Sequence, residues 1–275
     1  MSEVSLVLTQ YEDPRIRSTL ASVSEQDRPP AEIVIADGSR DPQFREKLAG
    51  WADEHGARTV HEAGASVARA RNLALQAAEG DILAFLDTDQ RAPEGWLSAL
   101  VAPVEAGEAD WAGGPTRPET ELDLMALKER RLYAAAREDP TRIPMGNSAW
   151  HRRVFADVDG FDERLAMGGE DWDLALRAAR AGFEGTLVEE AWVHHDLTRL
   201  DTYRAVAGKQ FDYNVGGAMA YLSNRRLADR LSQDIPQLER HWFDLVEPVL
   251  KAAALPVAAW RLWRAGGADV PAIEA

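Results

Sequence analysis

Residues 83–93 read LAFLDTDQRAP, an apolar run that ends abruptly in Asp87-Thr88-Asp89 and is followed by Pro93, a residue typical of a first helical turn. A short apolar run of this kind predicts a buried strand, here over residues 82–87. Ligands of open α/β sheets bind outside the carboxyl ends of the strands, so these aspartates can hold a hard cation. Two carboxylates leave most of an Mg2+ or Mn2+ shell unfilled, which suits a metal that bridges to the phosphates of a nucleoside diphosphate.

The same triplet also has a purely structural explanation. Aspartate is frequent in turns and at helix N-caps, and Asp-x-Asp recurs by chance in an acidic chain. The sequence around the triplet therefore has to separate the two interpretations.

The first 90 residues alternate predicted strands and helices. Because polar residues cluster where the strands end, this β-α-β order predicts a parallel sheet, and residues 1–90 are expected to form a Rossmann-like nucleotide-binding half. The glycines in this half lack the G-x-G-x-x-G spacing of a dinucleotide site. The predicted strands are Val4 to Thr9, Ile33 to Ala36 and Arg58 to His61, and the helices are Arg15 to Ser24, Gln43 to His55 and Ser66 to Ala78.

Residues 91–200 are less regular and are expected to form an acceptor half, followed by a helical extension over residues 201–275 that packs on it. The fold class is thus α/β, with a mostly parallel central sheet flanked by helices. In this half we predict helices at Pro93 to Ala106 and Glu121 to Arg137, extended segments at Ala109 to Gly113 and Ile143 to Trp150, a helix beginning at Glu170, and a late strand from Leu187 to His195.

The composition excludes several classes of protein. Acidic residues number 46 against 31 basic ones, and the net charge of -15 argues against binding nucleic acid, whose phosphates would be repelled. The absence of cysteine excludes disulfides and cysteine ligands. The N-terminus has the acid Glu3 where a signal peptide would have basic residues, so a cytoplasmic location is expected.

The segment 243–263 is amphipathic, and its charged and proline residues argue against a spanning helix. Trp260, Arg261, Trp263 and Arg264 could seat it at the inner face of a membrane as a peripheral contact. Alternatively, the helix packs on its own domain or on a second copy in a homodimer.

A second acidic cluster, Glu170-Asp171-Trp172-Asp173, lies where a loop containing Gly168 and Gly169 becomes a helix. Acids in a first turn are favoured by the exposed amides and the helix dipole, and Asp173 is spaced to pair with Arg177. Asp173 is therefore expected to be structural. Glu170 and Asp171 have two open interpretations, capping of the helix or general-base catalysis on an acceptor hydroxyl.

Five ordered motifs of this chain together resemble the nucleotide-sugar glycosyltransferases of family 2, which have the GT-A fold. The motifs are LVLTQYED, IVIADGS, ARARNLAL, FLDTDQRAP and GNSAWHRRVFADVDGFDERLAMGGEDWDLALR, and they span about residues 4 to 200. The resemblance implies an inverting transferase that moves a sugar from a UDP-, GDP- or dTDP-sugar, with Mn2+ or Mg2+ as cofactor.

The resemblance also implies roles for particular residues. Thr9, Tyr11, Asp37 and Arg71 would line the nucleotide; Asp87, Thr88 and Asp89 would bind the metal and diphosphate; Glu170 and Asp171 would form the catalytic pair, with Asp171 as the base; and His194 or His195 would complete the metal shell. Strand alternation lets at most one of the two histidines face the site. Gly146 and Asn147 are expected to touch the donor sugar, and Trp172 to stack on a sugar face.

The chain departs from the family pattern at Ala36, which replaces the first of two acids often found there, so the nucleobase is not specified. Processive family members carry Gln-x-x-Arg-Trp and spanning helices, whereas residues 237–242 have one residue too many, so transfer of a single sugar is expected.

Two other functions compete with this one. A sugar-phosphate nucleotidyltransferase would have a Gly-rich basic loop near the N-terminus, and a non-catalytic nucleotide-sugar-binding protein would have lost Asp87, Asp89 or Asp171. The acceptor, whether a glycan, a lipid-linked molecule or a small metabolite, is left open.

Overall fold

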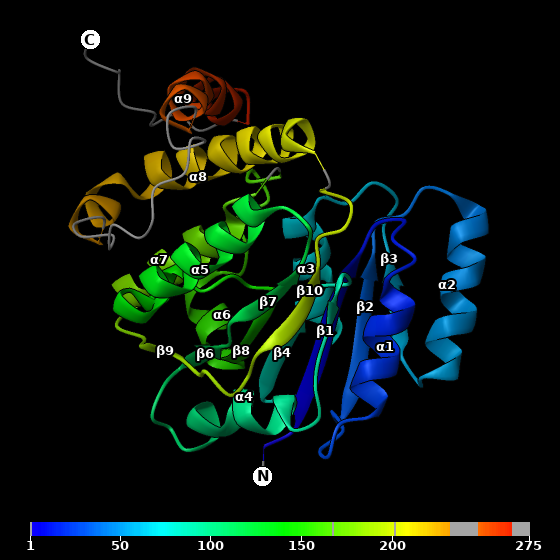
Figure 1. The fold of residues 1–275 in the computed structure, drawn as a ribbon. Coiled ribbons are helices and arrows are strands. Elements are labelled where there is room, and N and C mark those ends of the chain that lie inside the picture. The colour runs from blue at the N-terminus through cyan, green and yellow to red at the C-terminus, as the bar shows by residue number, and fades with distance from the viewer. Residues whose placement is uncertain (1, 167, 201, 232–246, 266–275) are drawn as a thin grey trace.

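A seven-stranded sheet runs through the molecule in the order β3-β2-β1-β4-β8-β6-β9 (Figure 1). The computed structural model describes residues 2–166, 168–200, 202–231 and 247–265. The strands are β1 Val4–Gln10, β2 Glu32–Asp37, β3 Arg58–His61, β4 Ile82–Leu86, β6 Trp111–Gly113, β8 Asn147–His151 and β9 Gly185–Leu187. The four strands of the first half are parallel, and β8 is antiparallel to both β4 and β6. The predicted mostly parallel α/β sheet is confirmed.

Pairing between strands places the predicted polar residues at one edge of this sheet. Thr9 of β1 is in register with Ala36 of β2, and the next pair is Gln10 with Asp37. The antiparallel strand β8 begins beside the end of β4, where Leu86 pairs with Asn147. The carboxyl ends of β1, β2 and β4 therefore meet, as expected for a parallel sheet.

A second sheet of three short strands lies beside the end of β4. Its order is β5-β10-β7, with β5 Gln90–Arg91, β10 Val193–Asp196 and β7 Thr116–Glu119. The single late strand predicted over Leu187 to His195 is therefore wrong. The chain leaves β9 in a turn, closed by the Ala191 amide on the Val188 carbonyl at 3.2 Å, and re-enters an extended conformation in the other sheet.

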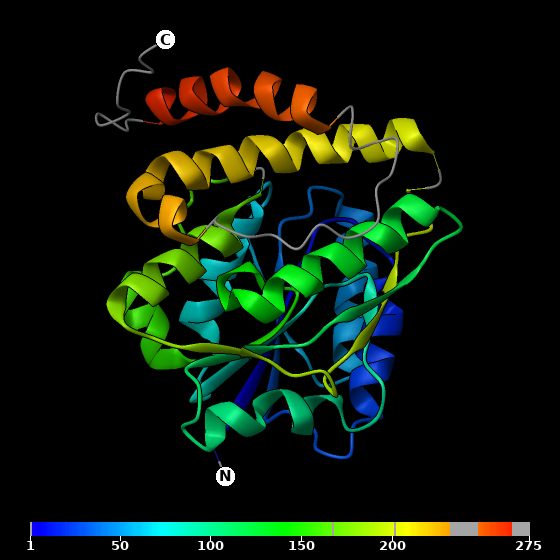
Figure 2. The same cartoon turned by 60° about the vertical axis from the view of Figure 1, so that its left-hand side comes forward.

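Helices cover both faces of the large sheet, so that its alternating side chains form two cores (Figures 1 and 2). One face packs against α1, α2 and α4, and the opposite face against α3, α6 and α7. The helix bounds are α1 Ile16–Ser24, α2 Pro42–Glu54, α3 Val67–Ala77, α4 Trp96–Glu105, α5 Asp123–Glu138, α6 Arg152–Val158, α7 Glu170–Ala181, α8 Tyr203–Leu231 and α9 Glu247–Arg264, with a 3-10 turn η1 at Pro140–Arg142.

Helices α8 and α9 lie together across the end of the molecule opposite the N-terminus (Figures 1 and 2). A small core joins them, in which Val215 and Met219 of α8 meet Ala258 and Leu262 of α9. Leu165, in the loop before α7, packs into the same core. None of the helices described is both long enough and apolar enough to cross a membrane. The predicted segment 243–263 begins outside the described residues and continues as α9.

Candidate active site

The Asp87-Thr88-Asp89 turn is held tightly at the end of β4. The Asp87 amide donates to the Gly146 carbonyl at 2.9 Å, and the Thr88 carbonyl accepts from the buried Thr19 hydroxyl at 3.0 Å. A Cβ on Gly146 would lie 2.0 Å from Asp87 Oδ2, so only glycine leaves room for this carboxylate. Thr88 is buried, whereas Asp87 and Asp89 keep partial access to solvent. The local fold thus fixes where the two carboxylates lie.

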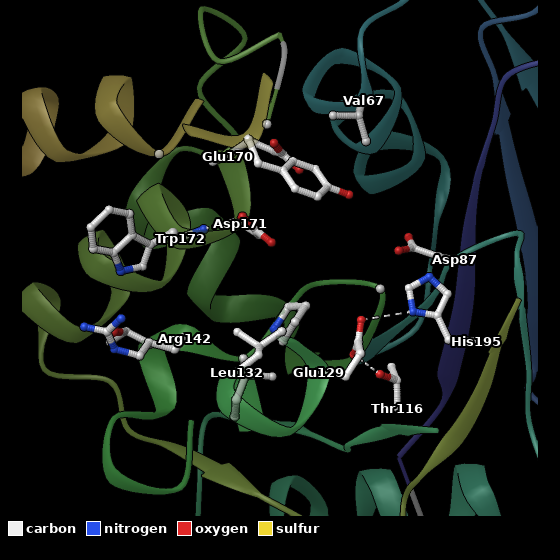
Figure 3. A pocket seen from close by; sticks show the side chains of 18 of the residues that line it. Val67, Asp87, Thr116, Glu129, Leu132, Arg142, Glu170, Asp171, Trp172 and His195 are labelled. Atoms are coloured by element: carbon white, nitrogen blue, oxygen red, sulfur yellow. Dashed lines mark hydrogen bonds and ion pairs between the residues drawn. The ribbon is translucent and has the colours of Figure 1, made fainter. Parts of the chain in front are cut away.

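Asp87 opens into a cavity of about 670 Å³ that is bounded by both halves of the chain (Figure 3). Asp87 and Asp171 point toward one another across it, while Trp172 and Arg142 line the far end. The remaining walls come mainly from α3, α5, the loop before α7, and α8, which contribute Val67, Glu129, Leu132, Tyr133, Gly168, Gly169, Tyr213 and Gly217.

Arg71 of α3 connects the two acidic clusters. It is buried, its Nη1 donates to Glu170 Oε1, and its Nη2 lies 3.7 Å from Asp87 Oδ1. Burial alone would lower the pKa of the guanidinium, but the charges of Glu170, Asp87 and Asp171 raise it. Arg71, which the resemblance assigns to the nucleotide, lies between the carboxylates of both clusters.

Glu170 and Asp171 enter the cavity from the first turn of α7. Gly169 caps this helix in the left-handed region at φ 83°, and the Asp171 carboxylate accepts from the Trp172 amide at 2.8 Å. Glu170 is buried, and its Oε2 has no hydrogen-bond partner among the described residues. Burial, opposed by Arg71 and reinforced by Asp171, raises the pKa of Glu170 to about 7. Asp171 is the more accessible carboxylate of the pair.

Asp173 is structural, as expected, and is more deeply buried than a surface pair would be. Its Oδ2 lies 2.7 Å from Arg177 Nη2, and its Oδ1 accepts from Asn224 of α8 at 2.6 Å. Asp173 therefore anchors α8 to the helix that carries Asp171.

His195 of β10 lies between two carboxylates. Its Nε2 is 3.6 Å from Asp89 Oδ1, and its Nδ1 is 3.5 Å from Glu129 Oε1. Burial would lower the pKa of this imidazole, but Asp89 and Glu129 raise it to about 10. Burial would also raise the pKa of Asp89, but His195, Arg15 and Lys209 lower it.

His194 faces the other way, as strand alternation requires. Its ring packs edge-on against Trp192, and its Nδ1 is 3.3 Å from the surface residue Glu119. The structure thus brings His195, and not His194, to the aspartates.

The resemblance implies a divalent metal bound by the aspartates and a histidine. No three His, Asp or Glu side chains within the described ranges are already close enough to hold a metal by themselves. Asp87, Asp89 and His195 nevertheless lie close together. Burial and the charge of Asp89 raise the pKa of Asp87, whereas the charge of Arg71 opposes this rise. This oxygen-rich donor set fits Mg2+ or Mn2+ if phosphate oxygens supply the remaining ligands and if the metal displaces the proton from His195 Nε2.

The other predicted contact residues lie in different surroundings. Three of them, Thr9, Tyr11 and Asp37, lie at the ends of β1 and β2 and do not line the large cavity. The side chain of Tyr11 is 53% exposed. Asp37 is buried, and its carboxylate accepts a hydrogen bond from the Ser39 amide at 2.9 Å. Gly146 and Trp172 line the cavity.

Asn147, which is expected to touch the donor sugar, does not line the cavity. It is buried, its Oδ1 accepts from Trp96 Nε1 at 2.8 Å, and its Nδ2 donates to the Ala191 carbonyl at 2.8 Å. Its side chain is occupied in joining β8 to α4 and to the turn before β10.

Sequence reasoning missed two ionisable residues at the site. Glu129 of α5 lines the cavity, and Lys209 of α8 lies within electrostatic range of Asp89 and Asp87. Burial by itself would lower the pKa of Lys209, but Tyr213, Asp89 and Asp87 together outweigh burial and raise this pKa. The only signal in the sequence was the scarcity of lysine, since the chain has four.

Comparisons with known proteins identify the family to which the chain belongs. The sequence model of glycosyl transferase family 2 matches residues 6–155, more than half of the chain. The chain is 26% identical to the succinoglycan biosynthesis protein ExoM of Rhizobium meliloti over 206 residues. This match covers 70% of this chain and 67% of ExoM. It is 31% identical to the pre-mycofactocin glycosyltransferase of Mycobacterium tuberculosis, over 70% of this chain and 42% of that protein. The match thus spans less than half of the mycobacterial relative.

Solved structures show the same fold. The mannosyltransferase PcManGT from Pyrobaculum calidifontis, in complex with GDP-Man and Mn2+, superposes with a TM-score of 0.64 at 20% identity, covering 97% of this chain and 76% of that one. S. aureus TarS 1–349 in complex with UDP-GlcNAc gives a TM-score of 0.56 at 16% identity, over 94% of this chain and 81% of that one. The chain belongs to glycosyl transferase family 2 and is an enzyme with the GT-A fold.

Proposed function

We propose that the chain transfers a single sugar from a nucleoside-diphosphate sugar to an acceptor hydroxyl, with inversion and with Asp171 as the general base. The observation that carries the proposal is the placement of Asp171 across the cavity from Asp87 (Figure 3). A base on one side of the sugar and diphosphate-binding groups on the other favour in-line attack on C1. Residues 1–200 would form the catalytic domain, and residues 201–275 an extension packed on it.

The diphosphate end would be held by Asp87, Asp89 and His195 through Mn2+ or Mg2+. Such a metal neutralises the charge that develops on the leaving nucleoside diphosphate. PcManGT was solved with GDP-Man and Mn2+ and TarS with UDP-GlcNAc, so both nucleobases are candidates for the donor. Thr9, Tyr11 and Asp37, at the strand ends beside the aspartates, would line the nucleoside.

The remaining roles follow from the cavity walls. Arg71 would keep Glu170 and Asp87 fixed while Asp171 takes the proton of the acceptor hydroxyl. Trp172, at the end opposite Asp87, would stack on the acceptor or donor sugar (Figure 3).

Substitution of the base tests the proposal. Asp171→Asn should lower kcat by about a hundredfold or more while donor affinity stays near wild type, because only proton transfer is lost. The matched control is Asp123→Asn, an exposed acid in the first turn of α5 outside the cavity. Normal turnover of Asp171→Asn would exclude Asp171 as the base. Separately, NMR of the product shows the configuration at the anomeric carbon, and a retained configuration would exclude inversion.

Nucleotide binding separates this function from its two competitors. Calorimetric titration with UDP, GDP, dTDP and CDP, each with Mn2+ and with EDTA, should identify one nucleotide that binds in a metal-dependent manner. A nucleotidyltransferase would instead turn over a nucleoside triphosphate and a sugar phosphate. Donor binding without any transfer would indicate a non-catalytic binding protein.

We also propose that α9 makes a peripheral membrane contact at the cytoplasmic side. Its outer face exposes Trp260, Trp263 and Val249, while Ala254 and Ala258 on the opposite face pack inward. The charged residues at positions 249–264 are all basic, although the chain as a whole is strongly acidic.

Vesicle sedimentation tests this contact. Vesicles of anionic lipid should pull down the wild-type chain, and a Trp260→Ser/Trp263→Ser double variant should stay in the supernatant. If the chain ignores the vesicles and instead forms a dimer that the double variant loses, the same face is an interface between two copies.

A further inference from the structure

Glu129 is an ionisable residue at the site to which no role has been assigned so far. It comes from α5, in the second half of the chain, and its side chain is only 13% exposed. Its Oε1 lies 3.5 Å from His195 Nδ1, and its Oε2 accepts from the Thr116 hydroxyl (Figure 3). A buried carboxylate is costly unless it has partners of this kind.

The small sheet fixes these partners relative to one another. Thr116 lies in β7, whose register pairs Thr116 with Val193 of β10, two residues before His195. Glu129 is therefore tied through Thr116 to the same sheet that carries the imidazole. His195 also pairs with Gln90 of β5, next to Asp89. The carboxylates of Glu129 and Asp89 thus face the two nitrogens of one ring.

The two ring nitrogens have different surroundings. Nδ1 is inaccessible to solvent and has no hydrogen-bond partner among the described residues, and Glu129 Oε1 lies 3.5 Å from it as an ion-pair contact. Nε2 faces Asp89 at 3.6 Å, on the side of the aspartate cluster. A carboxylate beside Nδ1 selects the ring orientation that presents Nε2 to a ligand on the other side, as in carboxylate–histidine–metal arrangements.

We propose that Glu129 is a positioning residue that orients His195 toward Asp89 and the diphosphate-binding end of the cavity. Removal of Glu129 leaves Nδ1 buried beside no acceptor and allows the ring to turn over. The proposal rests on the proposed function, since the role of His195 depends on it. The orientation of the ring can nevertheless be measured in the absence of any ligand.

The test uses the full chain with Glu129→Gln and Glu129→Ala. The first readout is the pair of ring 15N shifts of His195 in the metal-free protein, assigned by comparison with His195→Gln. Glu129→Ala should change both shifts, and Glu129→Gln should change them less, because its amide oxygen can still accept from Nδ1. The second readout is Mn2+ affinity in the presence of UDP or GDP, which should fall by about 10- to 100-fold in Glu129→Ala.

Glu119→Gln is the matched control, since Glu119 makes the corresponding contact with His194 on the exposed side of the same strand. It should leave both readouts unchanged. Wild-type His195 shifts in a folded Glu129→Gln and Glu129→Ala protein would overturn the proposal, as would an equal change in Glu119→Gln. If the wild type binds no nucleotide with Mn2+, the proposed function fails, while the ring shifts still decide the role of Glu129.

Discussion

A contact between two glycine backbones packs the loop before α7, which contains Gly168 and Gly169, against α8. Gly216 of α8 lies beside Gly168, and a Cβ on Gly216 would be 2.1 Å from the Gly168 carbonyl oxygen. Because backbone atoms form both sides of this contact, no side-chain rotation can relieve it. Gly216→Ala must therefore displace α8 or the loop that leads into Glu170 and Asp171.

Two opposing effects set the magnitude for Gly216→Ala. Alanine stabilises a helix interior by about 0.5–1 kcal/mol relative to glycine. Overpacking costs about 1–3 kcal/mol, and here the contact falls about 1 Å short of the 3.0 Å that Cβ atoms keep. The net expectation is a loss of about 1–2 kcal/mol in the free energy of unfolding, or a few degrees in Tm.

Gly208→Ala in the same helix is the control, because a Cβ there would meet nothing within 4 Å. Thermal denaturation should show Gly208→Ala at or above the wild-type Tm and Gly216→Ala below it. Gly216→Ala should also have a reduced kcat, since the loop positions Asp171. If both variants are equally stable and active, α8 does not pack on the loop as described and the reasoning fails.

Three further predictions concern the acidic clusters. The raised pKa of Glu170 means that its neutral form is favoured in the folded state. Its contribution to stability is therefore complete below about pH 4.5 and is lost as the pH rises to about 7. Denaturant titrations at the two pH values should show that Glu170→Gln removes this loss, which is at most about 3 kcal/mol. Arg71→Met should cost about 3–5 kcal/mol, because it leaves Glu170 buried without its cation, and an undiminished Tm would contradict the bridge. Gly146→Ala should weaken metal-dependent nucleotide binding by displacing the Asp87 carboxylate, and unchanged calorimetric affinity would count against that contact.

Local signals in the sequence were sufficient for the main architecture and for both acidic clusters. Asp87 and Asp89 follow an apolar strand, and Glu170 and Asp171 follow two glycines at the start of a helix. Such signals depend on residues that are neighbours along the chain. They predict the structure correctly because strand ends and helix starts are themselves local structures. Strand alternation likewise predicted that one histidine at most would face the site.

Register and long-range packing decided the rest. The predicted late strand divides between two sheets, and this division determines that His195 faces Asp89 while His194 faces Glu119. Long-range packing likewise places the Asn147 side chain in the core, where it hydrogen-bonds to Trp96 and to the Ala191 carbonyl.

By itself, the sequence determined an acidic α/β chain with two carboxylate clusters, because composition and periodicity are properties of neighbouring residues. Only the tertiary structure brought Glu129 of α5 and Lys209 of α8 to those clusters. On an amphipathic helix, an acid or a lysine that ends in an active site has the same local sequence as one that ends in solvent. The difference arises only when the helix packs, since packing decides which face is buried and against which charges.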